Sequence, residues 1–345
     1  MRKNVMRYYL LPEEGKFYKA NLHAHSTVSD GKNTPAQLKE LYKSNGYSIL
    51  AMTDHELLVE HSDLDDEDFL TLTAVEYAIV EKKSWLEAKT LEFNMFARDQ
   101  HNTTQVCFSP TSVKHGEVWR VPEVKYVGET LKKSFDKEFM QRVIDEANAN
   151  GFLISLNHPY CSFIDIEDVG ELEGLFAMEI YNHDSYMCGY NEYSPNMYEQ
   201  MLRRGKKLSC IAADDCHGNL PDSNVYCGRY GGWVMIKAKE LKYDEVIGAL
   251  ERGDFYASTG PSIEELYVED DTVHIKCSPA KEIAMLTCHR TFSGRKIAKE
   301  GEYFTEATFR FPKGQPYFRF DVIDERGHHA NTRAYYPDSI QGDCQ

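Results

Sequence analysis

The stretch 21–30 reads Asn-Leu-His-Ala-His-Ser-Thr-Val-Ser-Asp and places His23 and His25 two residues apart, with Asp30 further on. Residues i and i+2 of an extended strand point to the same face, so a strand over residues 18–22 would aim both imidazoles at one point. Neutral imidazole is the commonest protein ligand for metals. Most isolated His-x-His pairs are surface or core histidines, so the meaning of this one depends on the rest of the chain.

Further residues of metal-ligand type follow the later apolar runs of the chain. These runs cover residues 48–52, 69–75, 152–156, 176–181 and 208–213. The ligand-type residues just beyond their ends are Asp54, His55, Glu76, His158, Asp215 and His217, and Glu179 lies within the run 176–181. Mixed imidazole and carboxylate ligands suit zinc, manganese or iron, and a single structural zinc uses only about four of them. The sequence therefore predicts an open site for more than one ion.

Strands and helices alternate over most of the chain. Helices are predicted at residues 35–45, 137–149, 195–204 and 244–252, and residues 99–134 form a long polar segment that we interpret as a lid or insertion. Such alternation predicts a parallel sheet with helices outside. About seven strands with ligand-type residues at their carboxyl ends predict a closed, TIM-like (β/α) barrel, which places its catalytic groups at that face. An open doubly wound sheet would draw its site from only a few strands.

The pattern changes near Gly260 and Pro261. From residue 263 onward, short segments of alternating polar and apolar residues replace the helices. This pattern predicts a small all-β domain of the sandwich type. We therefore predict an α/β domain over residues 1–261, which holds every candidate ligand, and a β domain over residues 262–345.

Composition narrows the class of protein. The net charge of −16 argues against binding to duplex nucleic acid, which requires clustered Lys and Arg. The nine cysteines are odd in number and irregularly spaced, as is typical of reduced thiols in a cytosolic protein. No secretory signal is recognisable at the start of the chain, and no apolar stretch approaches the roughly 18 residues of a membrane span. We expect a cytoplasmic protein without a membrane partner.

Taken together, the motifs resemble those of a known family. His-x-His followed by Ser-Asp-Gly, then Thr-Asp-His, a Glu at the next strand end, His-Pro, Glu-Ile-Tyr-Asn and Asp-x-His are similar to motifs of the polymerase-and-histidinol-phosphatase (PHP) superfamily of metal-dependent phosphoesterases, over about residues 17–260. The resemblance implies a distorted seven-stranded barrel with two or three divalent ions (manganese, zinc or iron). The remaining segment resembles a β sandwich that is appended in some bacterial members.

The resemblance also implies a ligand set for each ion. The residues are His23, His25, Glu76 and Asp215 for the first ion, Glu76 and His158 for the second, and Asp30, His55 and His217 for the third. Members usually add a histidine on the fourth strand, where this chain has Glu92. Asp30 stands where some members have histidine, so this chain departs from the family pattern at two ligand positions.

The function implied is hydrolysis of a small phosphorylated metabolite or nucleotide, by attack of a metal-bound hydroxide on phosphorus. His23, His25, Glu76 and Asp215 would form the catalytic centre, and the candidate substrate contacts are Arg229, Tyr181 and Asn182. Two alternatives stay open: amide or lactone hydrolysis on the same barrel, and a non-catalytic metal-binding regulatory or scaffold protein. The sequence predicts neither the substrate nor the oligomeric state.

Overall fold

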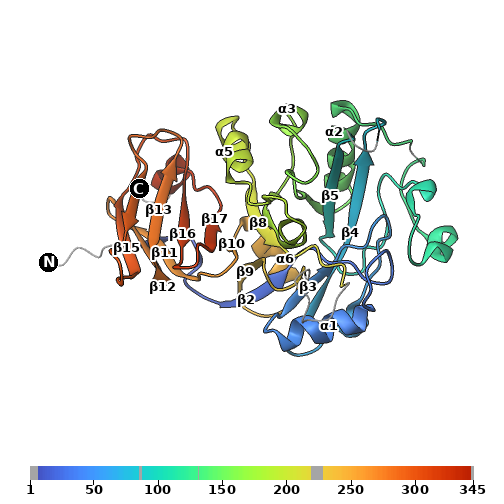
Figure 1. The fold of residues 1–345 in the computed structure, drawn as a ribbon, viewed down its shortest axis with the longest axis horizontal. Coiled ribbons are helices and arrows are strands. Elements are labelled where there is room, and N and C mark those ends of the chain that lie inside the picture. Colours follow the sequence, from blue (N-terminus) through green and yellow to red (C-terminus); the bar gives the residue numbers. More distant parts are fainter. Residues whose placement is uncertain (1–6, 85–87, 131, 219–227, 343–345) are drawn as a thin grey trace.

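The strands of this protein form one large mixed sheet and one small sheet. The computed structural model describes residues 7–84, 88–130, 132–218 and 228–342. The large sheet (Figure 1) contains, in spatial order, β14 (Gly294–Ile297), β13 (Glu282–Thr287), β16 (Phe318–Ile323), β17 (His329–Thr332), β10 (Phe255–Ser258), β9 (Trp233–Ala238), β2 (Lys16–Asn21), β3 (Ile49–Met52), β4 (Leu70–Val80), β5 (Thr90–Ala97), β6 (Phe152–Leu156), β7 (Ala177–Asn182) and β8 (Ser209–Ala213).

Strands β2 to β8 lie side by side in sequence order, but they do not all run in the same direction. Strands β2, β3 and β4 are parallel, as are β6, β7 and β8, whereas β5 is antiparallel to both of its neighbours. The prediction of a wholly parallel sheet is therefore wrong for β5. Residues 81–89, which join β4 to β5, are too few for the crossover of a dozen or more residues that parallel pairing requires.

A mixed α/β fold built on a large sheet is confirmed, but closure into a barrel is not. No ladder joins β8 to β2 or β9 within the described ranges. A single parallel bridge between Ala24 and Cys216 links the segments that follow β2 and β8. The sheet is therefore not closed by a ladder between β8 and β2, and the closed seven-stranded barrel stays a prediction.

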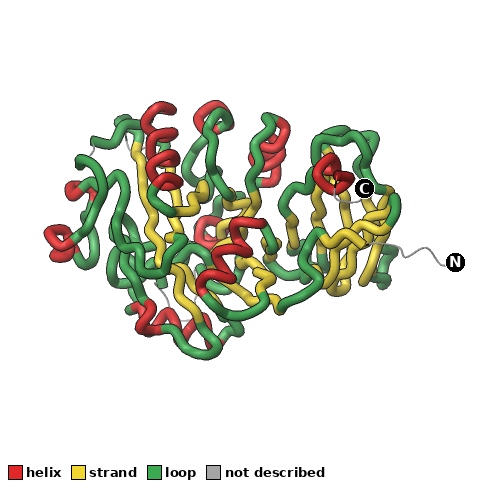
Figure 2. Tube along the Cα trace, turned by 180° about the vertical axis from the view of Figure 1, so that it is seen from behind, coloured by secondary structure: helices red, strands yellow, loops and turns green. Residues whose placement is uncertain are grey.

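Two of the predicted helices begin at side-chain caps, whereas Ser194, before α5, makes no capping hydrogen bond. Thr34 caps α1 and accepts a hydrogen bond from the Gln37 N–H, and Asp136 caps α2 in the same way. Figure 2 shows the helices flanking the large sheet, while strands dominate the end of the molecule built by β11 to β17. The helices are α1 (Pro35–Ser44), α2 (Lys137–Ala149), α3 (Ile166–Val169), α4 (His183–Met187), α5 (Pro195–Arg203), α6 (Tyr243–Arg252) and α7 (Pro337–Gly342), with short 3-10 turns η1 (Ser62–Leu64), η2 (Pro110–Ser112) and η3 (Val118–Glu123).

The small sheet packs on one end of the large sheet. It contains β1 (Arg7–Tyr9), β11 (Ile263–Glu269), β12 (Thr272–Ala280) and β15 (Phe304–Arg310). Phe309 lies 5.5 Å from Phe320 of β16 between ring centroids, and Phe311 lies 5.9 Å from Phe318, so the two sheets share an apolar core. The C-terminal segment is therefore all-β except for α7, as two packed layers.

The large sheet continues across the predicted domain boundary. Strand β10 pairs with β9 on one side and with β17 on the other. Strand β1, from the start of the chain, pairs with β11 of the small sheet. The division at residue 261 therefore stays a prediction about autonomous folding.

Two features bear on the expected environment of the protein. No described helix is both long enough and apolar enough to cross a membrane. Every cysteine within the described ranges is a free thiol, as the irregular spacing predicts. The cytoplasmic location itself stays a prediction.

Candidate metal centre

The four residues predicted for the first ion converge on one buried point. His23 and His25 follow β2, Glu76 lies within β4, and Asp215 follows β8. One ligand atom of each residue lies within 4.8 Å of those of the other three. His23 Nε2 is 3.2 Å from Glu76 Oε1, and His25 Nε2 is 3.0 Å from Asp215 Oδ1. The geometry suits a four-ligand cation site; that these residues hold a metal stays a prediction.

Two further ligand sets adjoin the first and share residues with it. One consists of His25, Asp30, His55 and His217, and the other of His55, Glu76 and Glu92. His158 Nε2 lies 3.5 Å from Glu76 Oε1 and also 3.5 Å from Glu92 Oε2. All residues predicted as metal ligands therefore lie in or beside one cluster, which we call the metal centre.

The reversed direction of β5 explains why Glu92 reaches the metal centre. Glu92 lies near the start of β5 and pairs with Ala78 of β4, two residues beyond Glu76. Residues two apart share a face of a sheet, so the carboxylates of Glu76 and Glu92 lie on the same side. Burial, followed by the charge of Glu76, raises the pKa of Glu92 to about 8.

Carboxylate and amide groups around the metal centre orient its ligands. His23 Nδ1 hydrogen-bonds to Glu179 Oε1 at 2.7 Å, so the Nε2 atom is the one that faces the cluster. Asn157 Nδ2 donates to Glu76 Oε1 at 2.6 Å, and Asn182 Nδ2 donates to Glu179 Oε2 at 3.0 Å. Asn157 was not among the predicted site residues, although its position between β6 and His158 is a signal that could have identified it.

Asp54 fixes a loop instead of facing the metal centre. Its carboxylate accepts hydrogen bonds from the backbone N–H and the hydroxyl of Ser26 at 2.8 and 2.7 Å. It also accepts hydrogen bonds from the same two groups of Ser29 at 3.0 and 2.7 Å. Asp54 therefore holds the turn that carries Asp30, and this use of its oxygens accounts for its absence from the ligand sets.

The chemistry of the cluster fits divalent cations. Asp215 Oδ1 is buried and has no hydrogen-bond partner among the described residues. Although burial lowers the pKa of His23, the carboxylates of Asp215 and Glu76 raise it well above its ordinary value. Buried carboxylates at this density need compensating positive charge. Divalent ions held by His23, His25, Glu76 and Asp215 would provide that charge without protonated imidazoles.

Metal uptake should release protons. Burial lowers the pKa of His25, but the adjacent carboxylates of Asp215 and Glu76, at 3.0 and 3.2 Å from its Nε2 atom, raise it to about 10, so the imidazole is protonated at neutral pH. A cation must displace that proton, and its apparent affinity should therefore rise about tenfold per pH unit for each proton released. Titrating Mn²⁺ calorimetrically at pH 7.5, in buffers of different ionisation enthalpy, should give a buffer-dependent heat. A heat that is independent of the buffer would contradict this expectation.

A cavity of about 490 Å³ opens beside the metal centre. Asp30, His55 and Glu92 form part of its lining. Lys133 also lines it, and the ammonium group of this residue pairs with the Glu56 carboxylate. A molecule bound in this cavity would therefore touch the candidate ligands directly.

None of the three predicted substrate contacts lines this cavity. The Tyr181 hydroxyl hydrogen-bonds to His183 Nδ1 at 2.8 Å, and Asn182 Nδ2 donates a hydrogen bond to Glu179 Oε2, as described above. The Arg229 guanidinium lies 5.9 Å from the Tyr230 ring centroid. Their contact with substrate stays a prediction.

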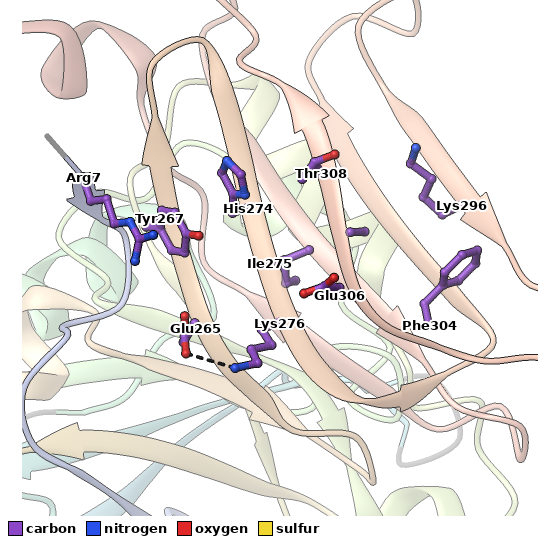
Figure 3. Close-up of a pocket in the computed structure, with 11 residues that line it drawn as sticks. Arg7, Glu265, Tyr267, His274, Ile275, Lys276, Lys296, Phe304, Glu306 and Thr308 are labelled. Atoms are coloured by element: carbon purple, nitrogen blue, oxygen red, sulfur yellow. Dashed lines mark hydrogen bonds and ion pairs between the residues drawn. The ribbon is translucent and has the colours of Figure 1, made fainter. Parts of the chain in front are cut away.

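A second cavity, of about 510 Å³, lies on the outer face of the small sheet. Figure 3 shows the residues that line this cavity, among them Tyr267 and His274, whose rings stack with centroids 4.8 Å apart. Lys276 and Glu265 form an ion pair across the strands at 3.3 Å. This cavity shares no residue with the metal centre. It is slightly larger than the cavity beside the metal centre, but volume alone does not indicate a catalytic site.

Comparison with known proteins found similarity at the level of structure. No protein-family model and no curated protein matches the sequence. A two-domain protein from Bacteroides vulgatus, described as containing a predicted PHP-like metal-dependent phosphoesterase, is 15% identical, with 97% of this chain and 99% of that chain covered and a TM-score of 0.44.

Two other solved structures cover less of this chain. A putative metal-dependent phosphoesterase from Bifidobacterium adolescentis is 17% identical over 62% of this chain and 93% of that chain, with a TM-score of 0.36. An amidohydrolase from Chromobacterium violaceum, with bound sulfate and no metal, is 15% identical over 60% of this chain and 93% of that chain, with a TM-score of 0.37.

Proposed function

We propose that this protein is a metal-dependent phosphoesterase that hydrolyses a small phosphorylated metabolite or nucleotide. The observation that carries the proposal is the sharing of ligands: His25, His55 and Glu76 each belong to two of the three ligand sets. Ions held by overlapping sets are neighbours. Neighbouring divalent ions, when bound, lower the pKa of water and stabilise both the attacking and the leaving oxygen of a phosphoryl transfer.

The protein's own residues would orient the ligand atoms and set the side from which the substrate approaches. Glu179 and Asn157 fix the orientation of His23 and Glu76, so the ligand atoms need little rearrangement on binding. The side chains of His23 and His25 are fully buried, whereas His55 is partly exposed at the cavity. The substrate phosphate would therefore approach from the side of His55. In the overall reaction, water adds its oxygen to phosphorus, and the leaving oxygen takes a proton.

The test is hydrolysis by protein of defined metal content. The protein is stripped with a chelator, reloaded separately with manganese, zinc or iron, and assayed with 4-nitrophenyl phosphate beside 4-nitroacetanilide and an aryl lactone. We expect phosphate release that is absent from the stripped protein and restored by at least one metal. Folded, metal-loaded protein that cleaves only the anilide or the lactone would overturn the assignment to phosphoesters.

A further inference from the structure

We propose that the substrate carries a second anionic group, a carboxylate or another phosphate, and that Lys82 and Lys114 bind it. Both lysines line the cavity beside the metal centre. The inference rests on the proposed function, because it assumes that the first phosphate lies at the metal centre. It extends that function by specifying a substrate with two anionic ends.

The cavity has two chemically different walls. Asp30, His55 and Glu92 contribute the metal centre. Lys82 and Lys114 come from two separate segments of the chain, one just beyond β4 and the other between η2 and η3. A small molecule in about 490 Å³ can touch both walls at once.

The segment that carries Lys114 is fixed against the turn that carries Asp30. The Glu117 N–H donates to the Val28 carbonyl at 2.9 Å. Gly116 has a φ of +64°, and a Cβ added there would lie 2.2 Å from the carbonyl oxygens of Val28 and Ser29. Only glycine allows this approach of the two backbones. Lys114 is therefore held at the cavity by the fold of its own loop.

The other acidic residues of the lining, Glu56 and Glu81, pair with Lys133 and Lys83, so Lys82 and Lys114 have no ion-pair partner among the described residues. The side chains of Lys82 and Lys114 are both exposed. Lys133, in the same cavity, differs: it pairs with Glu56, donates to the Ala78 carbonyl at 2.7 Å and lies 3.6 Å from the Tyr77 ring centroid. Two ammonium groups without an ion-pair partner in the described ranges, at one cavity of a chain with net charge −16, favour an anionic ligand there.

Binding of non-hydrolysable phosphonates separates this inference from turnover. The ligands are propylphosphonate, 3-phosphonopropanoate and propane-1,3-diylbisphosphonate, titrated calorimetrically into metal-loaded protein at fixed ionic strength. We expect each ligand with two anionic ends to bind at least tenfold more tightly than propylphosphonate. The stronger of the two identifies the second group as carboxylate or phosphate.

The variant Lys82→Met/Lys114→Met should abolish this preference and leave the Kd of propylphosphonate within twofold of wild type. Lys125→Met, at an exposed position outside this cavity, is the matched control and should change neither value. Equal affinity for all three ligands in the wild type, or a preference that survives in the double variant, would overturn the inference. If the preference is lysine-dependent but no phosphoester is hydrolysed, the anion site stands and the proposed function fails.

Discussion

Asp215→Asn is expected to lower kcat at least about a hundredfold, a change that corresponds to nearly 3 kcal/mol of transition-state stabilisation. The side chain supplies a ligand atom to the four-residue set, and His23 Nε2 and His25 Nε2 lie 3.1 and 3.0 Å from its Oδ1 atom. An amide is a much weaker ligand for a divalent cation than a carboxylate. Metal content should therefore fall together with turnover.

The same substitution should leave the fold intact. Asp215 has a φ of +57°, a left-handed conformation that asparagine tolerates well, and an asparagine oxygen can still accept the hydrogen bond that Asn182 Nδ2 donates to Asp215 Oδ2 at 3.3 Å. In the metal-free protein the Asp215 carboxylate compensates the imidazoles of His23 and His25, so its replacement should lower the Tm while leaving the circular dichroism spectrum at the assay temperature unchanged. Asp145→Asn, on the surface of α2, is the matched control. A variant that retains more than about a tenth of wild-type kcat would contradict the role assigned to Asp215.

Arg319→Met is expected to lower the free energy of unfolding by about 3 kcal/mol. Arg319 lies on β16, is only 1% exposed, and forms an ion pair with Glu199 of α5 at 2.6 Å. It also donates to Asn331 Oδ1 at 3.0 Å. The substitution leaves the Glu199 and Asn331 oxygens without this donor. We expect a value at the lower end of the range for broken buried pairs, because Glu199 is 18% exposed and keeps a hydrogen bond from the Tyr317 hydroxyl.

Denaturant unfolding of the metal-free protein measures this change. Arg310→Met provides the control, because Arg310 is exposed on β15 and its loss should cost less than about 0.5 kcal/mol. The result also bears on domain organisation, since Arg319 lies beyond residue 261 and Glu199 before it. An Arg319→Met variant within about 1 kcal/mol of wild type would show that this pair does not stabilise the contact between the two parts.

The residues of the metal centre were predictable because strand ends are marked locally. An apolar run followed by a His, Asp or Glu is visible in sequence, and parallel strands gather their carboxyl ends at one edge of a sheet. His23, His25, Glu76 and Asp215 were selected in this way, and the structure brings them together, although β4 continues to Val80 and Glu76 therefore lies inside the strand and not beyond its end. The further division into ligand sets came from the family resemblance. In the structure His25 and His55 each lie in two clusters, and His158 belongs to none of the three.

The direction of a strand and the contact partners of a side chain were harder to predict, because they depend on residues that are distant in the sequence. The order of polar and apolar residues in β5 does not indicate that this strand is antiparallel to its neighbours. The short connection over residues 81–89 does indicate it. The use of Asp54 as a loop anchor depends on where Ser26 and Ser29 lie in space. Nothing in a sequence window indicates that Arg319 meets Glu199, which is far away in the chain.

The most direct test of the central claim is the number of ions that the wild-type protein binds. Overlapping ligand sets that share His25, His55 and Glu76 predict neighbouring ions, not a single one. Protein stripped of metal, dialysed against excess Mn²⁺ and freed of unbound ion by gel filtration should contain at least two ions per chain by elemental analysis. A reproducible content of one ion or none, in protein that remains folded, would contradict the account of this site as a multinuclear metal centre.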